Sequence, residues 1–182
     1  MSVKRVVEAI VSESCVDLFA SVGVSLTAPT ARQSDAALEK DPVAGEIAFT
    51  GQTFSGSLLL VSTFQFVAAS IPRELQTGSL TSSSAGDWLR VRDWVKELCN
   101  QLVGRIKNAG GPYGFSFGSR LPIALTGDAI LGAVKGYPGP PYRFNFNGAQ
   151  TVLVFMKTSV PLEGEATMQE STFAREGDVI LF

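Results

Sequence analysis

The chain has 182 residues, of which 45% are hydrophobic and 18% charged, with a net charge of −2 and a pI near 5.2. This length favours one globular domain, and the composition excludes a mostly disordered chain. Because there is no basic surface to follow a phosphate backbone, we expect no nucleic-acid partner. The sequence has no histidine, which excludes Ser-His and Cys-His nucleophile pairs and the commonest transition-metal ligand.

The apolar runs of the chain are short. The longest, residues 58–61 and 151–156, fall far short of the roughly 20 residues that a membrane-spanning helix needs, so we expect no membrane span. Charged residues from Lys4 to Asp17 interrupt any signal-peptide apolar region. The sequence therefore predicts a cytoplasmic location.

The first part of the chain predicts a long helix followed by a strand and a loop. Residues 3–22 place apolar side chains at spacings close to helical, and Gly23 follows where a helix would end. Residues 24–33 favour a strand. Residues 34–43 are polar and contain Asp-Pro, which is typical of a loop.

A hairpin and a short helix are expected next. The runs 46–50 and 55–62 are rich in β-forming residues, and Gly51 between them allows a positive φ. A hydroxyl residue at position 62 or 63 can cap a short helix, which ends before Pro72.

The longest periodic segment extends from about Ala85 to Asn108. Ser84 and Asp87 have the spacing of a capping box at its start, and two glycines follow its end. The serine-rich stretch 77–87 before it is typical of a connector. We therefore predict a long helix here.

Four further strands are predicted after this helix, separated by glycine and proline turns, and the last three suggest a meander. They are residues 113–117, 121–126, 142–147 and 151–158. The tail beyond residue 160 ends in the apolar run 178–182, which we expect to dock as a strand. The order of elements favours an α+β fold with helices packed on a sheet.

The long helix has two different faces. At 100° per residue, one apolar set spans roughly 80° and predicts the core face: Val91, Val95, Leu98, Leu102 and Ile106. A second set spans roughly 60° nearly opposite and forms what we call the polar stripe: Asp93, Glu97, Asn100 and Gly104. An ordinary solvated face explains a polar line alone. However, a mid-helix glycine costs roughly 1 kcal/mol relative to alanine, which suggests that a partner's backbone comes close there.

Other chemistry-bearing residues of this helix have structural interpretations. Trp88 and Trp94 are large aromatics at helical spacing, which are more often packing residues than binding residues. Cys99 falls toward the core side and has no histidine to deprotonate it. We expect Cys15 and Cys99 to be buried free thiols rather than a disulfide.

The pattern D-x-x-x-E-x-x-N-x-x-x-G from Asp93 to Gly104, followed by Pro122, resembles the signature helix of the CheC/CheX chemotaxis phosphatases. The segment 45–70 resembles the glycine-marked hairpin and short helix of that family. The resemblance covers roughly residues 3–160.

The resemblance implies one CheX-like domain over residues 1–182, with 160–182 as a C-terminal extension. The expected fold is CheC-like, a mostly antiparallel sheet with two long helices and one short helix packed on it. Because the first helix offers Ser12 and Glu13 but no asparagine at a matching place, the chain resembles the single-site CheX type. A homodimer formed through a sheet edge is also implied, and the apolar late strands suit it.

An asparagine amide offers both a donor and an acceptor and can therefore orient a water, as a glutamine does in small GTPases. The resemblance implies that Asn100 aligns water on the aspartyl phosphate of a phosphorylated CheY-like receiver domain. Glu97 would pair with a receiver lysine, Asp93 would be a rim contact, and Gly104 would leave room for the partner. We expect no cofactor or metal site in the chain itself, with Mg²⁺ supplied by the receiver.

Two alternatives remain open. The chain could be a non-catalytic interaction or assembly module, resembling the switch-protein middle domains, which predicts binding or self-association without turnover. It could also be a self-contained hydrolase that uses Asp93 and Glu97 as an acid/base pair, which requires a cleft lined by both carboxylates.

Overall fold

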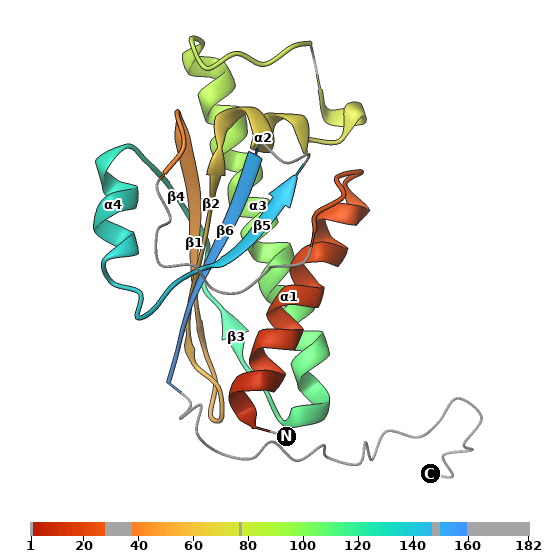
Figure 1. Ribbon diagram of the computed structural model, residues 1–182. Coiled ribbons are helices and arrows are strands. Elements are labelled where there is room, and N and C mark those ends of the chain that lie inside the picture. Colours follow the sequence, from red (N-terminus) through yellow and green to blue (C-terminus); the bar gives the residue numbers. More distant parts are fainter. Residues whose placement is uncertain (1, 28–37, 77, 147–149, 160–182) are drawn as a thin grey trace, which may run out of the picture.

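The computed structural model describes residues 2–27, 38–76, 78–146 and 150–159 (Figure 1). One antiparallel sheet is covered on one face by two long helices that lie side by side, α1 (Val3–Ser21) and α3 (Ala85–Gly110). A short helix, α4 (Asp128–Val134), lies against the opposite face. The predicted α+β class and mostly antiparallel sheet are confirmed, and α4 is an additional short helix.

The strands lie in the order β3-β1-β2-β6-β5, and β4 also pairs with β1. Their bounds are β1 Pro42–Thr50, β2 Gly56–Thr63, β3 Gly118–Ser119, β4 Ile123–Thr126, β5 Tyr142–Phe146 and β6 Gln150–Thr158. The predicted hairpin is present as β1 and β2, with Ile47 opposite Leu58. The predicted meander of the last three strands is wrong, since β4 pairs with β1 while β5 and β6 pair with each other. The chain forms α4 after β4 and crosses to the far edge of the sheet.

The strand predicted at 113–117 is also wrong. The chain forms a 3-10 turn, η2 (Gly111–Tyr113), and Gly114 then adopts a φ of 79°. The alternating aromatics imitate a strand, but they pack instead on the hairpin: the ring centroids of Phe115 and Phe54 lie 4.6 Å apart, and those of Phe117 and Phe49 4.8 Å apart. Tertiary packing of the aromatics therefore overrides the local β pattern.

Two other segments are only partly described. Where residues 24–33 favoured a strand, Thr27 forms a single bridge to Asn145 of β5, and 28–33 lie outside the described residues. The predicted loop at 34–43 is described only from residue 38, and β1 already begins at Pro42. The predicted strand at 178–182 lies outside the described residues.

Helices α2 and α3 begin at the hydroxyl residues expected to cap them. Thr63 Oγ1 accepts a hydrogen bond of 3.1 Å from Phe66 N at the start of α2 (Phe64–Ala69). Ser84 Oγ accepts one of 3.2 Å from Asp87 N at the start of α3. The Asp87 carboxylate accepts from Thr81 N at 3.0 Å, so it also holds the connector before the helix. A further 3-10 turn, η1 (Arg73–Leu75), lies between α2 and that connector.

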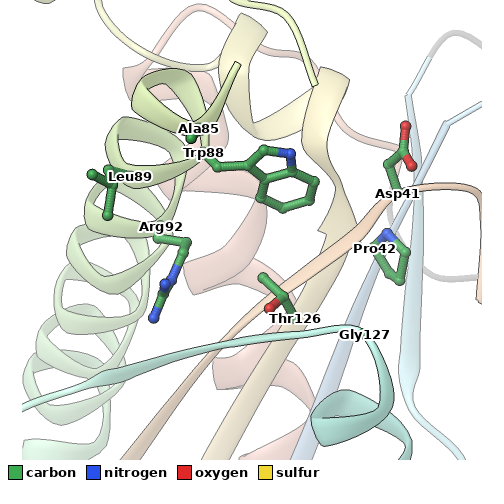
Figure 2. A pocket seen from close by; sticks show the side chains of 8 residues that line it. All are labelled: Asp41, Pro42, Ala85, Trp88, Leu89, Arg92, Thr126 and Gly127. Atoms are coloured by element: carbon green, nitrogen blue, oxygen red, sulfur yellow. The ribbon is translucent and has the colours of Figure 1, made fainter. Parts of the chain in front are cut away.

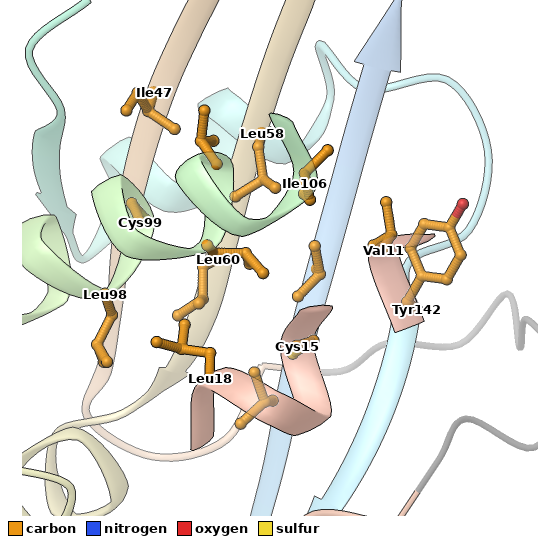
Figure 3. Close-up of a cluster of buried hydrophobic side chains, with 14 of the residues drawn as sticks. Val11, Cys15, Leu18, Ile47, Leu58, Leu60, Leu98, Cys99, Ile106 and Tyr142 are labelled. Carbon is orange, nitrogen blue, oxygen red and sulfur yellow. The ribbon is translucent and has the colours of Figure 1, made fainter. Parts of the chain in front are cut away.

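The main core lies between the sheet and the two long helices (Figure 3). In this view Leu98, Cys99 and Ile106 of α3 face side chains of the sheet and of α1. The predicted core face of α3 is confirmed, since all five of its residues are at most 2% exposed. Both cysteines are buried and free as expected, and burial raises the pKa of the Cys99 thiol to about 12.

Gly45 allows α3 to lie very close to β1. A Cβ at this position would lie 2.5 Å from Cys99 Sγ and 2.8 Å from the carbonyl oxygen of Val95. The absence of a side chain at Gly45 therefore allows this close approach of α3 to the sheet. None of the helices in the described part of the chain combines the length and apolar character that crossing a membrane requires.

Candidate functional site

The polar stripe lies on the outer face of α3, as predicted. Asp93, Glu97 and Asn100 are exposed and Gly104 is partly exposed, while the residues on the opposite side of the same turns are buried. One helix therefore brings all four predicted residues onto one line, without help from any other element.

The side chains of the polar stripe differ in their partners. Glu97 Oε1 accepts a hydrogen bond of 2.8 Å from Gln101 Nε2, one turn further along. Asp93 Oδ1 lies 2.7 Å from Lys96 Nζ, but the Asp93 side chain is 74% exposed and such pairs contribute little. Within the described residues, the Asn100 amide makes no hydrogen bond to another side chain or to the backbone. Its donor and its acceptor are therefore both open to a water or a partner.

Gly104 has open space above it. A Cβ built there would meet no atom within 4 Å, in contrast to the crowded position of Gly45. The packing of the described chain thus gives no reason for glycine at this helix position, where alanine would be more stable by roughly 1 kcal/mol.

A groove of about 640 Å³, here called the α3 groove, opens beside the first turns of α3 (Figure 2). Its walls are the start of α3, the start of β1 and the turn between β4 and α4. The lining residues are Asp41, Pro42, Ala85, Trp88, Leu89, Arg92, Thr126 and Gly127. Sequence reasoning missed this groove because three distant segments build it. Its one sequence signal is Leu89, a large apolar residue at an outward position of the helix.

The α3 groove does not support the self-contained hydrolase. Neither Asp93 nor Glu97 lines it, and both carboxylates project from the convex surface of a helix rather than into a shared cleft. Among the described residues, no three histidine, cysteine, aspartate or glutamate side chains gather in a way that would hold a metal ion.

The two tryptophans make the packing contacts expected of them. Trp94 Nε1 donates to Ser70 Oγ at 3.0 Å, which ties α3 to the end of α2. Trp88 Nε1 donates to the Ser82 carbonyl at 2.8 Å, and its ring lies 4.9 Å from that of Phe64. Trp88 has a second surface, however, because it also forms a wall of the α3 groove.

No family model matches the sequence, and no curated protein matches it either. Solved structures do match. A chain in the CheX-CheY-BeF3-Mg²⁺ complex from Borrelia burgdorferi aligns with a TM-score of 0.60 at 15% identity, covering 80% of this chain and 96% of that one. A CheC-like superfamily protein from a Shewanella species aligns with a TM-score of 0.58 at 18% identity, covering 84% and 97%.

The middle domain of FliM from Vibrio alginolyticus is also similar, with a TM-score of 0.53 at 10% identity over 85% of this chain and 92% of that one. The order of elements and these likenesses together establish a CheC-like fold. Within that fold, α3 carries the polar stripe outward.

Proposed function

We propose that this protein dephosphorylates the aspartyl phosphate of a CheY-like receiver domain. The observation that carries the proposal is the exposed Asn100 amide, which has no partner among the described residues and lies on the outer face of α3 in a CheC-like fold. In this reaction Asn100 holds the attacking water in line with the phosphorus atom.

The convex shape of the site requires that the partner supply the rest of the catalytic apparatus. In phosphoryl transfer, a metal ion and positive side chains do most of the electrostatic work. A phosphorylated receiver would bring its own Mg²⁺ and lysine, so this chain need only insert an amide. The presence of CheX, CheY, BeF3 and Mg²⁺ together in the Borrelia burgdorferi complex supports this division of roles.

Glu97 is placed to anchor the inserted amide. It precedes Asn100 by three residues, which is roughly 4.5 Å along the helix axis and 60° around it. The hydrogen bond from Gln101 restricts the Glu97 side chain but leaves its other oxygen free for a receiver lysine. Asp93 then contacts the rim of the receiver, and Gly104 admits its backbone.

The test is the rate at which a phosphorylated CheY-like receiver loses its phosphoryl group, measured with wild type and Asn100→Ala. We expect wild type to accelerate the loss and Asn100→Ala to lower the rate by at least about 100-fold, the scale typical for removal of one positioned catalytic group. Asn108→Ala is the matched control, since Asn108 is exposed on the same helix two turns on. Full activity of Asn100→Ala would refute the assignment.

The second candidate is a non-catalytic interaction or assembly module, which the likeness to the FliM middle domain favours. It predicts that the wild-type protein binds a receiver or another copy of itself without shortening the lifetime of the phosphoryl group. Receiver binding combined with an unchanged lifetime would select this candidate.

We further propose a cytoplasmic homodimer formed through a sheet edge. In the described sheet β3 and β4 are the outer strands on one side and β5 is the outer strand on the other, and Thr27 already pairs with part of the β5 edge at Asn145. Light scattering at micromolar concentration tests the dimer, and a monomeric mass would contradict it.

A further inference from the structure

The polar stripe alone is a weak docking surface. Protein interfaces draw most of their energy from a few desolvated apolar, aromatic or arginine side chains. The stripe offers two exposed carboxylates, one amide and a glycine without a side chain. Because exposed charged pairs contribute little, a partner held in register over Asn100 needs another contact.

Leu89 extends the line of the polar stripe by one helical turn. It is 60% exposed and lies beside the proposed interface, where a large apolar side chain can anchor a partner. Helix geometry places it roughly 20° from Asn100 around the axis and roughly 16.5 Å from it along the axis. A partner that covers Asp93 and Asn100 would therefore meet Leu89 as well.

Leu89 also forms the rim of the α3 groove, so the groove and the stripe are continuous. Figure 2 shows the Trp88 indole extending from α3 toward the facing strands and the Arg92 side chain extending along α3 below it. Pro42 forms part of the facing wall. The volume of about 640 Å³ is ample for a large apolar side chain and its neighbours.

Arg92 gives the groove a charge preference. It is exposed, it directly precedes Asp93, and its guanidinium makes no ion pair or hydrogen bond with the described residues. Arginine suits bidentate pairing with a carboxylate. Arg92 therefore offers an open cation at the groove, with which a carboxylate of a docked partner can pair.

We propose that the α3 groove is a second docking site for the receiver, taking one of its apolar side chains against Leu89 and Trp88 while Arg92 pairs with a receiver carboxylate. This inference rests on the proposed function, because it takes the receiver as the partner of the stripe. The footprint from Leu89 to Gly104 spans roughly 22 Å along the helix. A domain of 100 residues has a radius of gyration of about 13 Å, so one receiver covers both places.

The test is the affinity for a beryllofluoride-activated receiver with Mg²⁺, measured by isothermal titration calorimetry so that no catalysis is needed. We expect Leu89→Ala to weaken binding about tenfold and Arg92→Ala severalfold, with the Arg92 effect shrinking at high salt. Leu131→Ala in α4 and Lys135→Ala at its C-cap are matched controls, since both residues are exposed on the other face of the sheet. They should stay within about twofold of wild type.

Steady-state dephosphorylation gives a second readout. Because Asn100 is untouched in Leu89→Ala, the variant should raise KM more than it lowers kcat. Asn100→Ala should show the opposite pattern. A purely structural defect at Leu89 would instead lower the fraction of folded protein, which circular dichroism detects.

The outcomes separate the two proposals. Unchanged affinity of Leu89→Ala and Arg92→Ala overturns the docking site, as does wild type that binds no receiver. A groove that instead holds a second copy would show Leu89→Ala shifting a dimer to a monomer in light scattering with receiver affinity intact. If wild type binds the receiver through Leu89 without accelerating phosphoryl loss, the docking site stands and the phosphatase fails.

Discussion

The two faces of α3 differ in how closely other atoms approach them. On the inner face, Gly45 of β1 approaches so closely that even a methyl group would collide with Cys99 and the Val95 carbonyl. On the outer face, Gly104 has nothing within 4 Å of an added Cβ. The packing of the fold therefore explains glycine on the inner side of α3, whereas it gives no reason for Gly104 on the outer face.

The largest expected effect is on the inner face. Leu98→Ala removes a fully buried side chain from the core and should lower the free energy of unfolding by about 2–5 kcal/mol. Urea denaturation measures it. Leu89→Ala is the same substitution on the outer face of the same helix and should change stability by less than about 0.5 kcal/mol. Equal losses would show that the two faces are not distinct.

Gly45→Ala should cause the second-largest loss of stability. Because the nearest atoms include a backbone carbonyl that cannot rotate away, α3 must lift from the sheet, at a cost of about 1–3 kcal/mol. The urea midpoint should fall accordingly. The control is Gly118→Ala, since Gly118 is also in a strand but has open space around it. A neutral Gly45→Ala would mean that close contact does not fix the height of α3.

Gly104→Ala should act with opposite signs on stability and binding. The free energy of unfolding should rise by up to about 1 kcal/mol, because alanine favours the helix. Receiver affinity, measured by calorimetry, should fall, because the methyl group occupies the space that we propose the partner's backbone enters. Gly132→Ala in α4, where an added Cβ is equally free, should stabilise without changing affinity. Increases in both stability and affinity for Gly104→Ala would argue against close approach of a partner.

The smallest effect is expected for the ion pair between Asp93 and Lys96. Both side chains are substantially exposed, so Asp93→Ala should change the free energy of unfolding by less than about 0.5 kcal/mol. A double-mutant cycle with Lys96→Ala isolates the pair. A coupling well above this value would mean that the pair helps to hold the fold rather than to meet a partner.

Sequence periodicity predicted α3 well because a helix is a local structure. A repeat of 3.6 residues distinguishes the buried Val95 from the exposed Asn100 without knowledge of any other element. The caps at Thr63 and Ser84 were equally predictable, since each depends on contacts within three residues.

The errors all concern contacts between distant segments. The pairing of β4 with β1, rather than with its neighbours in sequence, depends on where the chain goes after Thr126. The aromatics from Tyr113 to Phe117 alternate like a strand, and only their packing on Phe49 and Phe54 decides otherwise. The sequence could not predict the α3 groove for the same reason, because Pro42, Trp88 and Thr126 come together only in the folded chain.

The wall that Trp88 forms in the α3 groove gives the protein an optical reporter. The chain contains two tryptophans. Trp94 is held by Ser70 away from the groove, whereas one surface of the Trp88 ring remains open to whatever enters it. Occupation of the groove replaces water beside this indole, so the emission of Trp88 should shift to shorter wavelength while that of Trp94 stays constant. A Trp94→Phe variant would then follow docking in real time without any added label.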